Sequence, residues 1–320
     1  EPISHQPQEG DFPCIRSLVE HIFGEQYELG MDYLQLLYLY PVQKLPILLL
    51  VSEERNTGKS TFLNFLKAVF QNNVTFNTNE DFRSQFNSDW AGKLLIMVDE
   101  VLLNRREDSE RLKNLSTTLS YKVEAKGKDR DEIGFFAKFV LCSNNEHLPV
   151  IIDAGETRYW VRKIVPLRND DTDFLQKLKA EIPAFLHFLQ HRQPSTKKES
   201  RMWFNPKLLE TDALRKIIRS NRNRLEIEMG ELLLDIMASV NVESVSFCLN
   251  DIIPLLVCSQ VKVEKSQVRK VVQECWKLAP ASNSLSYTTY QYDYNRECRY
   301  SPVRRIGRYY TVSKEQLETL

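Results

Sequence analysis

The chain has 320 residues, of which 42% are hydrophobic, and this predicts two or three domains with substantial cores. Its 43 Lys and Arg residues balance 43 Asp and Glu residues, which excludes attraction of nucleic acid by a global positive field, so any such binding needs local patches. Its six cysteines lack metal-ligand spacing and no apolar run reaches the roughly 20 residues that span a bilayer, so we expect reduced thiols, a cytoplasmic location and no membrane partner.

Residues 1–44 are expected to form a polar tail and a helical cap. The first 12 residues are polar and contain proline, and helical apolar stripes follow until Pro41 ends the pattern. The chain begins at Glu1 without an initiator Met or a signal peptide, which suggests a fragment of a longer protein.

A strand, a short loop and a helix in succession predict a phosphate-binding loop. The apolar run Leu45–Val51 predicts the strand, and a helical pattern begins at Phe62. Between them stands Gly58-Lys59-Ser60-Thr61, where backbone N–H groups and a helix N-terminus would bind phosphate. Lys59 would reach the β- and γ-phosphates of a nucleotide, and the Ser60 hydroxyl would contact Mg²⁺.

The residues that we assign to nucleotide binding all belong to this loop. They are Asn56, Thr57, Gly58, Lys59, Ser60 and Thr61. The loop departs from the usual pattern at Glu53, where glycine would relieve a tight backbone. A chance match in an ordinary strand–helix turn is the alternative interpretation.

Two acidic residues follow the next strongly apolar segment. Leu94–Val98 predicts a strand that is buried on both faces of a parallel sheet. Asp99 and Glu100 come directly after it, at the strand end where such sheets bind ligands. Asp99 would hold Mg²⁺, and Glu100 would orient or deprotonate an attacking water. Solvated acids after a buried strand are the alternative.

A hairpin and a third strand are predicted next. Strand-like segments flank Lys126, Gly127 and Lys128, and the tip of such a hairpin would touch a phosphate backbone. A solvated turn is the alternative. The apolar run 138–142 predicts a strand that leads to Asn144, whose amide would position water near the γ-phosphate, unless it simply forms a turn.

Two arginines, Arg158 and Arg162, stand in the segment that follows. A guanidinium here would act in trans on the nucleotide of a neighbouring subunit, because it stabilises the charge of a phosphoryl transition state. A surface salt bridge is the alternative. An amphipathic helix over 173–192 completes an ATPase-like core at 45–192, and a polar linker is predicted over 193–201.

A small α+β domain is predicted over 202–320. A basic helix over 214–224 opens it, further helices end with one over 265–278, and Tyr-, Val- and Arg-rich segments then predict a β-hairpin. Three helices followed by a hairpin is a winged-helix order, in which the third helix enters a major groove. Arg269 and Lys270 would then contact nucleic acid; a solvated helix or a protein contact is the alternative.

These motifs resemble, in order and spacing, a superfamily 3 helicase, and most of all the ATPase part of phage, plasmid and poxvirus-type primase–helicases. The resemblance covers residues 12–192. Carried over by position, it matches Lys59 and Ser60 to Walker A, Asp99 and Glu100 to Walker B, and Asn144 to the sensor. It matches Lys126 and Lys128 to the DNA-gripping hairpin. Arg158 matches the arginine finger, with Arg162 as runner-up.

The resemblance implies an α/β fold with an AAA+-like P-loop NTPase sheet, ATP and Mg²⁺ as cofactors, a hexamer, and movement along single-stranded DNA. Some members carry a primase domain before the core, and many carry a winged-helix-like domain after it. We therefore expect an ATP-dependent DNA helicase module of a phage or mobile-element replication protein. The rival hypothesis is a DNA-binding and assembly protein that docks on DNA or a replication partner through its C-terminal domain and hydrolyses little or no ATP.

Overall fold

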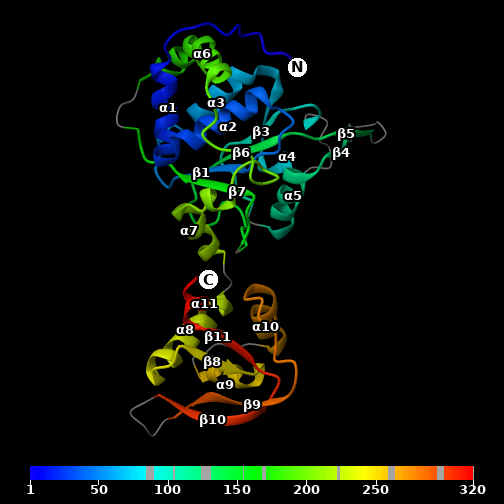
Figure 1. The fold of residues 1–320 in the computed structure, drawn as a ribbon, viewed down its shortest axis with the longest axis vertical. Coiled ribbons are helices and arrows are strands. Elements are labelled where there is room, and N and C mark those ends of the chain that lie inside the picture. Colours follow the sequence, from blue (N-terminus) through cyan, green and yellow to red (C-terminus); the bar gives the residue numbers. More distant parts are fainter. Residues whose placement is uncertain are drawn as a thin grey trace. The chain divides into compact units, whose positions relative to one another are not determined.

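The computed structural model forms two compact units, Glu1–Asn221 (unit 1) and Arg222–Leu320 (unit 2). The residues that it describes are 1–83, 90–103, 105–123, 131–153, 155–167, 171–221, 224–258, 264–293 and 299–319 (Figure 1). Within them, no helix is long and apolar enough to cross a membrane.

Unit 1 is built on a five-stranded sheet with the strand order β2-β3-β6-β1-β7. The strands are β1 (Ile47–Val51), β2 (Val74–Asn77), β3 (Leu95–Val98), β6 (Lys138–Ser143) and β7 (Tyr159–Lys163). Every pairing between neighbours is parallel, which confirms the predicted α/β fold with a parallel sheet. The order places β1 between β6 and β7, so the two strands beside it come late in the sequence.

Helices cover both faces of this sheet (Figure 1). One face carries α1 (Pro13–Phe23), α2 (Tyr27–Leu39), α3 (Lys59–Phe70) and α6 (Phe174–His191), and the other carries α4 (Asn79–Arg83), α5 (Arg106–Thr117) and α7 (Asp212–Ser220). Side chains alternate between the faces along a strand. Leu48 and Leu50 therefore join one hydrophobic core, whereas Ile47, Leu49 and Val51 join the other.

A short antiparallel pair extends from the sheet region. Strand β4 (Ser120–Val123) pairs with β5 (Asp131–Gly134), as the predicted hairpin requires. The predicted tip residues Lys126 and Lys128 lie outside the described residues.

The segment 193–201, predicted as a linker, packs onto unit 1 through the buried carboxylate of Asp32. Asp32 accepts hydrogen bonds from the backbone and side chains of Ser195 and Thr196, and it pairs with Arg192 at 2.5 Å. Helix α7 also belongs to unit 1, where it adds two buried side chains to a core face. The units accordingly divide after Asn221, beyond the boundary expected from composition.

Unit 2 has its own hydrophobic core. Its elements are α8 (Arg224–Val240), β8 (Ser244–Phe247), α9 (Leu249–Cys258), α10 (Lys265–Lys270), β9 (Leu285–Tyr292), β10 (Tyr300–Gly307), β11 (Tyr310–Ser313) and α11 (Lys314–Thr319). Strands β9 and β10 form an antiparallel hairpin, and β8 pairs with β11. The helix predicted over 265–278 is shorter, because a π-helical turn over Val271–Cys275 replaces its second half.

Replacing Asp32 by Ala is expected to destabilise unit 1 by about 3–5 kcal/mol, because the change leaves the buried Arg192 guanidinium without its buried partner. Chemical denaturation measures this change in the free energy of unfolding. Asp212→Ala is the matched control, because it removes an exposed ion pair with Arg215 and should change stability little. Equal unfolding midpoints for the two variants would contradict a structural role for Asp32.

Candidate functional site

The loop between β1 and α3, residues 52–58, lies at the carboxyl end of the sheet and is here called the β1–α3 loop. The Ser52 N–H donates to the carbonyl of Ser143, the last residue of β6, at 3.1 Å. Gly58 adopts φ = +79°, a left-handed conformation that favours glycine. Its carbonyl accepts the Phe62 N–H at 2.9 Å, so helix α3 starts directly from the loop.

Glutamate fits where the usual loop carries its first glycine. Among the described residues of the loop, the positive-φ positions are Asn56 and Gly58, so Glu53 needs no left-handed backbone. The Glu53 N–H donates to the Glu146 carboxylate at 3.3 Å. The loop entry is therefore held by a side chain from the segment after β6.

Glu146 is the buried centre of an ionic cluster that has two partly exposed lysines. Its carboxylate is 3% exposed and pairs with Lys163 at 3.0 Å and with Lys216 at 2.8 Å. Burial opposes the charged form, but the hydrogen bonds from Lys216 and Lys163 outweigh it and lower the pKa of Glu146. Glu146 therefore stays ionised and ties β7 and α7 to the loop.

Lys59, at the first turn of α3, is a buried cation with no ion pair among the described residues. Its ammonium group donates to the Thr57 hydroxyl at 3.2 Å. Burial lowers its pKa, against the opposing influence of charges that include Asp99 and Glu146. A buried cation without a partner is costly, so an anionic ligand at this position would be stabilising.

Ser60 and Asp99 meet at the carboxyl edge. The Ser60 hydroxyl donates to the Asp99 carboxylate at 2.7 Å, although 39 residues separate them in the chain. Glu100 follows with φ = +57°, a strained conformation for glutamate of the kind that often marks functional positions. Its N–H donates to Asp99, and its carbonyl accepts from Asn79.

The chemistry of these oxygen atoms fits Mg²⁺. This ion is typically bound by one or two carboxylates or hydroxyls, with water and substrate phosphates completing its octahedron. The structure shows no group of three or more His, Cys, Asp or Glu side chains that could hold a metal among its described residues. The pair Ser60 and Asp99 could therefore hold Mg²⁺ together with a phosphate ligand, but not by itself.

Asn144 lies between the loop and the acidic pair. It follows Ser143, whose backbone is bonded to Ser52 on one side and whose hydroxyl donates to the Val101 carbonyl at 2.9 Å on the other. Its own side chain is exposed. The structure thus places Lys59, Ser60, Asp99, Glu100 and Asn144 at the same end of the sheet, and their assignment to a single nucleotide site stays a prediction.

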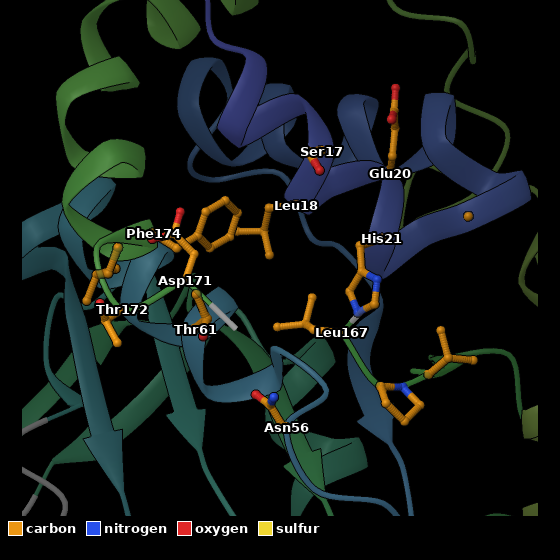
Figure 2. Close-up of a pocket in the computed structure, with 14 residues that line it drawn as sticks. Ser17, Leu18, Glu20, His21, Asn56, Thr61, Leu167, Asp171, Thr172 and Phe174 are labelled. Carbon is orange, nitrogen blue, oxygen red and sulfur yellow. The ribbon is translucent and has the colours of Figure 1, made fainter. Parts of the chain in front are cut away.

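A cavity of about 1010 Å³ opens beside the β1–α3 loop (Figure 2). Its walls include His21 from α1, Asn56 and Thr61 from the loop region, Leu167 from the segment after β7, and Phe174 from the start of α6. The His21 ring bonds to the Thr57 carbonyl at 3.0 Å, and the Leu167 N–H donates to the Asn56 carbonyl at 2.9 Å. Asn56 and Thr61 belong to the predicted phosphate-binding loop, but His21, Leu167 and Phe174 are far from it in the chain and carry no motif, so sequence reasoning missed the cavity.

Both candidate arginines are paired with acidic side chains of unit 1. The Arg158 carbonyl accepts the N–H of Ile47, which places Arg158 at the amino end of β1, and its guanidinium pairs with Glu156 at 2.7 Å. Arg162 is 9% exposed and pairs with Glu25 at 2.6 Å, against the helical cap. Arg162 is therefore engaged by the helical cap near the carboxyl end of β7, whereas Arg158 lies at the opposite end of the sheet from the loop.

The remaining predicted contacts lie elsewhere. Arg269 and Lys270 are exposed on α10 of unit 2, on a helix whose Val268 is buried. Lys216, which lies in the segment predicted as a basic helix over 214–224, pairs with Glu146 at the site in unit 1.

Comparisons with known proteins identify the fold more than the function. A family model described as "Family of unknown function (DUF5906)" matches residues 50–162, from the end of β1 through most of β7. No curated protein matches the chain.

Among solved structures, the apo structure of the NrS-1 C-terminal region (305–718) is 17% identical with a TM-score of 0.64, and the match covers 96% of this chain and 79% of that chain. An A-form apo structure of the same region is 19% identical with a TM-score of 0.58, covering 87% of this chain and 66% of that one. At these identities, the likeness shows the fold alone.

Replacing Glu146 by Gln is expected to destabilise unit 1 by roughly 1–3 kcal/mol at neutral pH, because the charged hydrogen bonds with Lys163 and Lys216 are lost. The pKa of Glu146 in the folded chain is lowered from its ordinary value of 4.5. The difference in free energy of unfolding between wild type and Glu146→Gln is therefore complete above pH 4.5, and it shrinks as the pH falls below that value. Denaturation across this pH range measures the difference. Glu54→Gln is the control, because Glu54 is the exposed neighbour in the same loop and forms no ion pair among the described residues. A difference independent of pH would contradict the assignment.

Proposed function

We propose that unit 1 is a P-loop ATPase of the AAA+-like type, and that the chain is a DNA helicase module of a phage or mobile-element replication protein. The observation that supports this best is the gathering of Lys59, Ser60, Asp99, Glu100 and Asn144 at one edge of a parallel sheet, beside a cavity of about 1010 Å³. Ligands bind outside the carboxyl ends of such strands.

Each residue has a defined role in this proposal. The loop N–H groups and the first turn of α3 would bind the phosphates, and Lys59 would neutralise the β- and γ-phosphates. Ser60 and Asp99 would hold Mg²⁺, which when bound neutralises charge on the phosphates. Glu100 would accept a proton from the attacking water, and Asn144 would orient that water.

The large cavity would hold the base and the sugar. It lies against the same loop and has both an apolar surface from Leu18, Leu167 and Phe174 and a polar surface from Ser17, Glu20 and His21 (Figure 2). Mostly apolar walls with a few placed polar groups are the usual composition of a small-molecule site.

The proposed ATPase needs a second copy of the chain. Arg158 stands at the amino end of the sheet, so it would complete the site of a neighbour rather than its own. Head-to-tail contacts of this kind close into rings, and a hexamer is the assembly that we propose. Lys126 and Lys128 in unit 1 would contact single-stranded DNA, as would Arg269 and Lys270 in a winged-helix-like unit 2. A primase domain or a replication partner would act together with the module.

A second candidate function is DNA docking with little or no hydrolysis. It is favoured by the pairing of Arg158 with Glu156, which occupies the guanidinium, and by the exposed Arg269 and Lys270 on α10. An assembled ring that binds DNA and does not turn over ATP would establish this alternative.

Lys59→Ala is expected to abolish ATP binding and turnover, and Glu100→Gln is expected to retain binding while losing about 10²–10⁴-fold in turnover. Steady-state hydrolysis with and without single-stranded DNA, together with nucleotide binding, measures both effects. Lys67→Ala is the matched control, because Lys67 lies on the same helix but donates to the Val74 carbonyl away from the loop. Unchanged turnover in Lys59→Ala would refute the assignment of the site.

Arg158→Ala and Glu100→Gln subunits should each be inactive alone and regain turnover when mixed. In mixed rings, about a quarter of the interfaces would join an intact Glu100 to a neighbour's intact Arg158. Hydrolysis after co-assembly, with native mass as a check of assembly, measures this complementation. Arg158→Ala turnover equal to wild type, or mixed rings that stay inactive, would exclude action in trans.

A further inference from the structure

Unit 1 has another cavity, of about 360 Å³, at the opposite end of β1 from the β1–α3 loop. One wall comes from the segment that joins α2 to β1, and the other comes from the turn after α6. The residues that define it are Tyr40, Gln43, Lys44, Lys198, Arg201 and Trp203. We call it the amino-edge cavity.

The amino-edge cavity is positively charged. Among the described residues, no acidic side chain lines it, and Lys44, Lys198 and Arg201 form no ion pair. Lys44 is 6% exposed; among the described residues its ammonium group donates to the Phe135 carbonyl at 2.8 Å and lies 5.2 Å from the centre of the Phe135 ring. Burial lowers the pKa of Lys44 to about 8, so a bound anion would stabilise its charged form. The cavity is therefore suited to an anionic ligand.

Two aromatic rings stand beside these cations. The rings of Tyr40 and Trp203 lie near parallel, with an interplanar angle of 27° and centroids 6.4 Å apart, and Tyr40 is 53% exposed. The Trp203 indole N–H donates to the Thr196 hydroxyl at 3.0 Å. Its backbone has φ = +75° and bonds to Ser200 and Glu199, so a strained turn fixes the ring at the cavity.

We propose that the amino-edge cavity binds one nucleotide of single-stranded DNA, with the base against Tyr40 and Trp203 and the phosphate among Lys44, Lys198 and Arg201. Basic grooves with exposed aromatic rings are the usual sites for single strands, because every base has a face that stacks. The volume is near the lower end of the about 300–1,000 Å³ range of small-molecule sites, which suits one nucleotide.

The choice of single-stranded DNA as the ligand rests on the proposed function. Binding of DNA at the amino-edge cavity, however, needs no ATP hydrolysis. The probe is a fluorescein-labelled thymidine oligomer, titrated into the full chain without ATP in both the wild type and the Lys59→Ala variant. Lys198→Glu is compared with Lys197→Glu, the exposed neighbour that does not line the cavity. The two variants carry the same charge change on adjacent residues, so their difference reports the cavity alone.

Lys198→Glu should weaken oligomer binding about fivefold more than Lys197→Glu and reduce the salt slope by about 0.7, the value for one lost phosphate contact on a single strand. Tyr40→Ala should weaken binding about fivefold or more through lost stacking. The oligomer should also quench tryptophan fluorescence at the same midpoint, and Trp203→Phe should remove that quenching.

Equal effects of Lys198→Glu and Lys197→Glu, or quenching that survives in Trp203→Phe, would overturn the proposal. Thymidine monophosphate that binds as tightly as the oligomer would also overturn it, because the cavity would then hold free nucleotide. Oligomer binding by a wild-type chain that shows no ATP turnover would contradict the proposed ATPase and leave the cavity assignment standing. ATP turnover in a chain whose Lys198→Glu and Lys197→Glu variants bind the oligomer equally would overturn the cavity assignment and leave the proposed ATPase standing.

Discussion

The parallel sheet of unit 1 buries both of its faces, and this constraint decides where polar chemistry can occur. The buried apolar residues of β1, β3, β6 and β7 all belong to one of two hydrophobic cores, so charged and polar side chains are concentrated towards the strand ends. The carboxyl ends carry Lys59, Asp99 and Asn144, and the amino ends carry Arg158 and the amino-edge cavity. Both proposed functions of unit 1 follow from this division.

The β1–α3 loop shows how a local departure from a common pattern is accommodated. A glutamate replaces glycine at position 53, and its backbone N–H is satisfied by the buried Glu146 carboxylate. That buried charge is tolerated because Lys163 and Lys216 pair with it, since an unpaired carboxylate at 3% exposure would be costly. The loop is thus supported from β7 and α7, in addition to its own backbone.

Sequence patterns predicted the elements whose signal is local. Runs of apolar residues identified β1, β3 and β6, and the polar residues directly after them, Asp99 and Asn144, lie close together because parallel strands end at one edge. Features that depend on distant partners were not predictable: Lys216 meets Glu146 across 70 residues, and Asp32 orders a segment whose composition is typical of a linker. Nothing in the local pattern could show that Arg162 turns inward to Glu25.

Strands β1 and β7 run directly between the amino and carboxyl ends of the sheet, where the two proposed sites lie. Strand β7 begins next to Arg158 and ends at Lys163, which pairs with the Glu146 that holds the loop entry. Strand β1, its parallel neighbour, is preceded by Lys44 of the amino-edge cavity and followed by the β1–α3 loop. A neighbour that engaged Arg158, or a strand of DNA that engaged Lys44, would therefore act on a five-residue strand whose far end contacts the proposed nucleotide. Coupling between sites needs an element that both sites bias, and β1 and β7 are the strands that run from one site to the other.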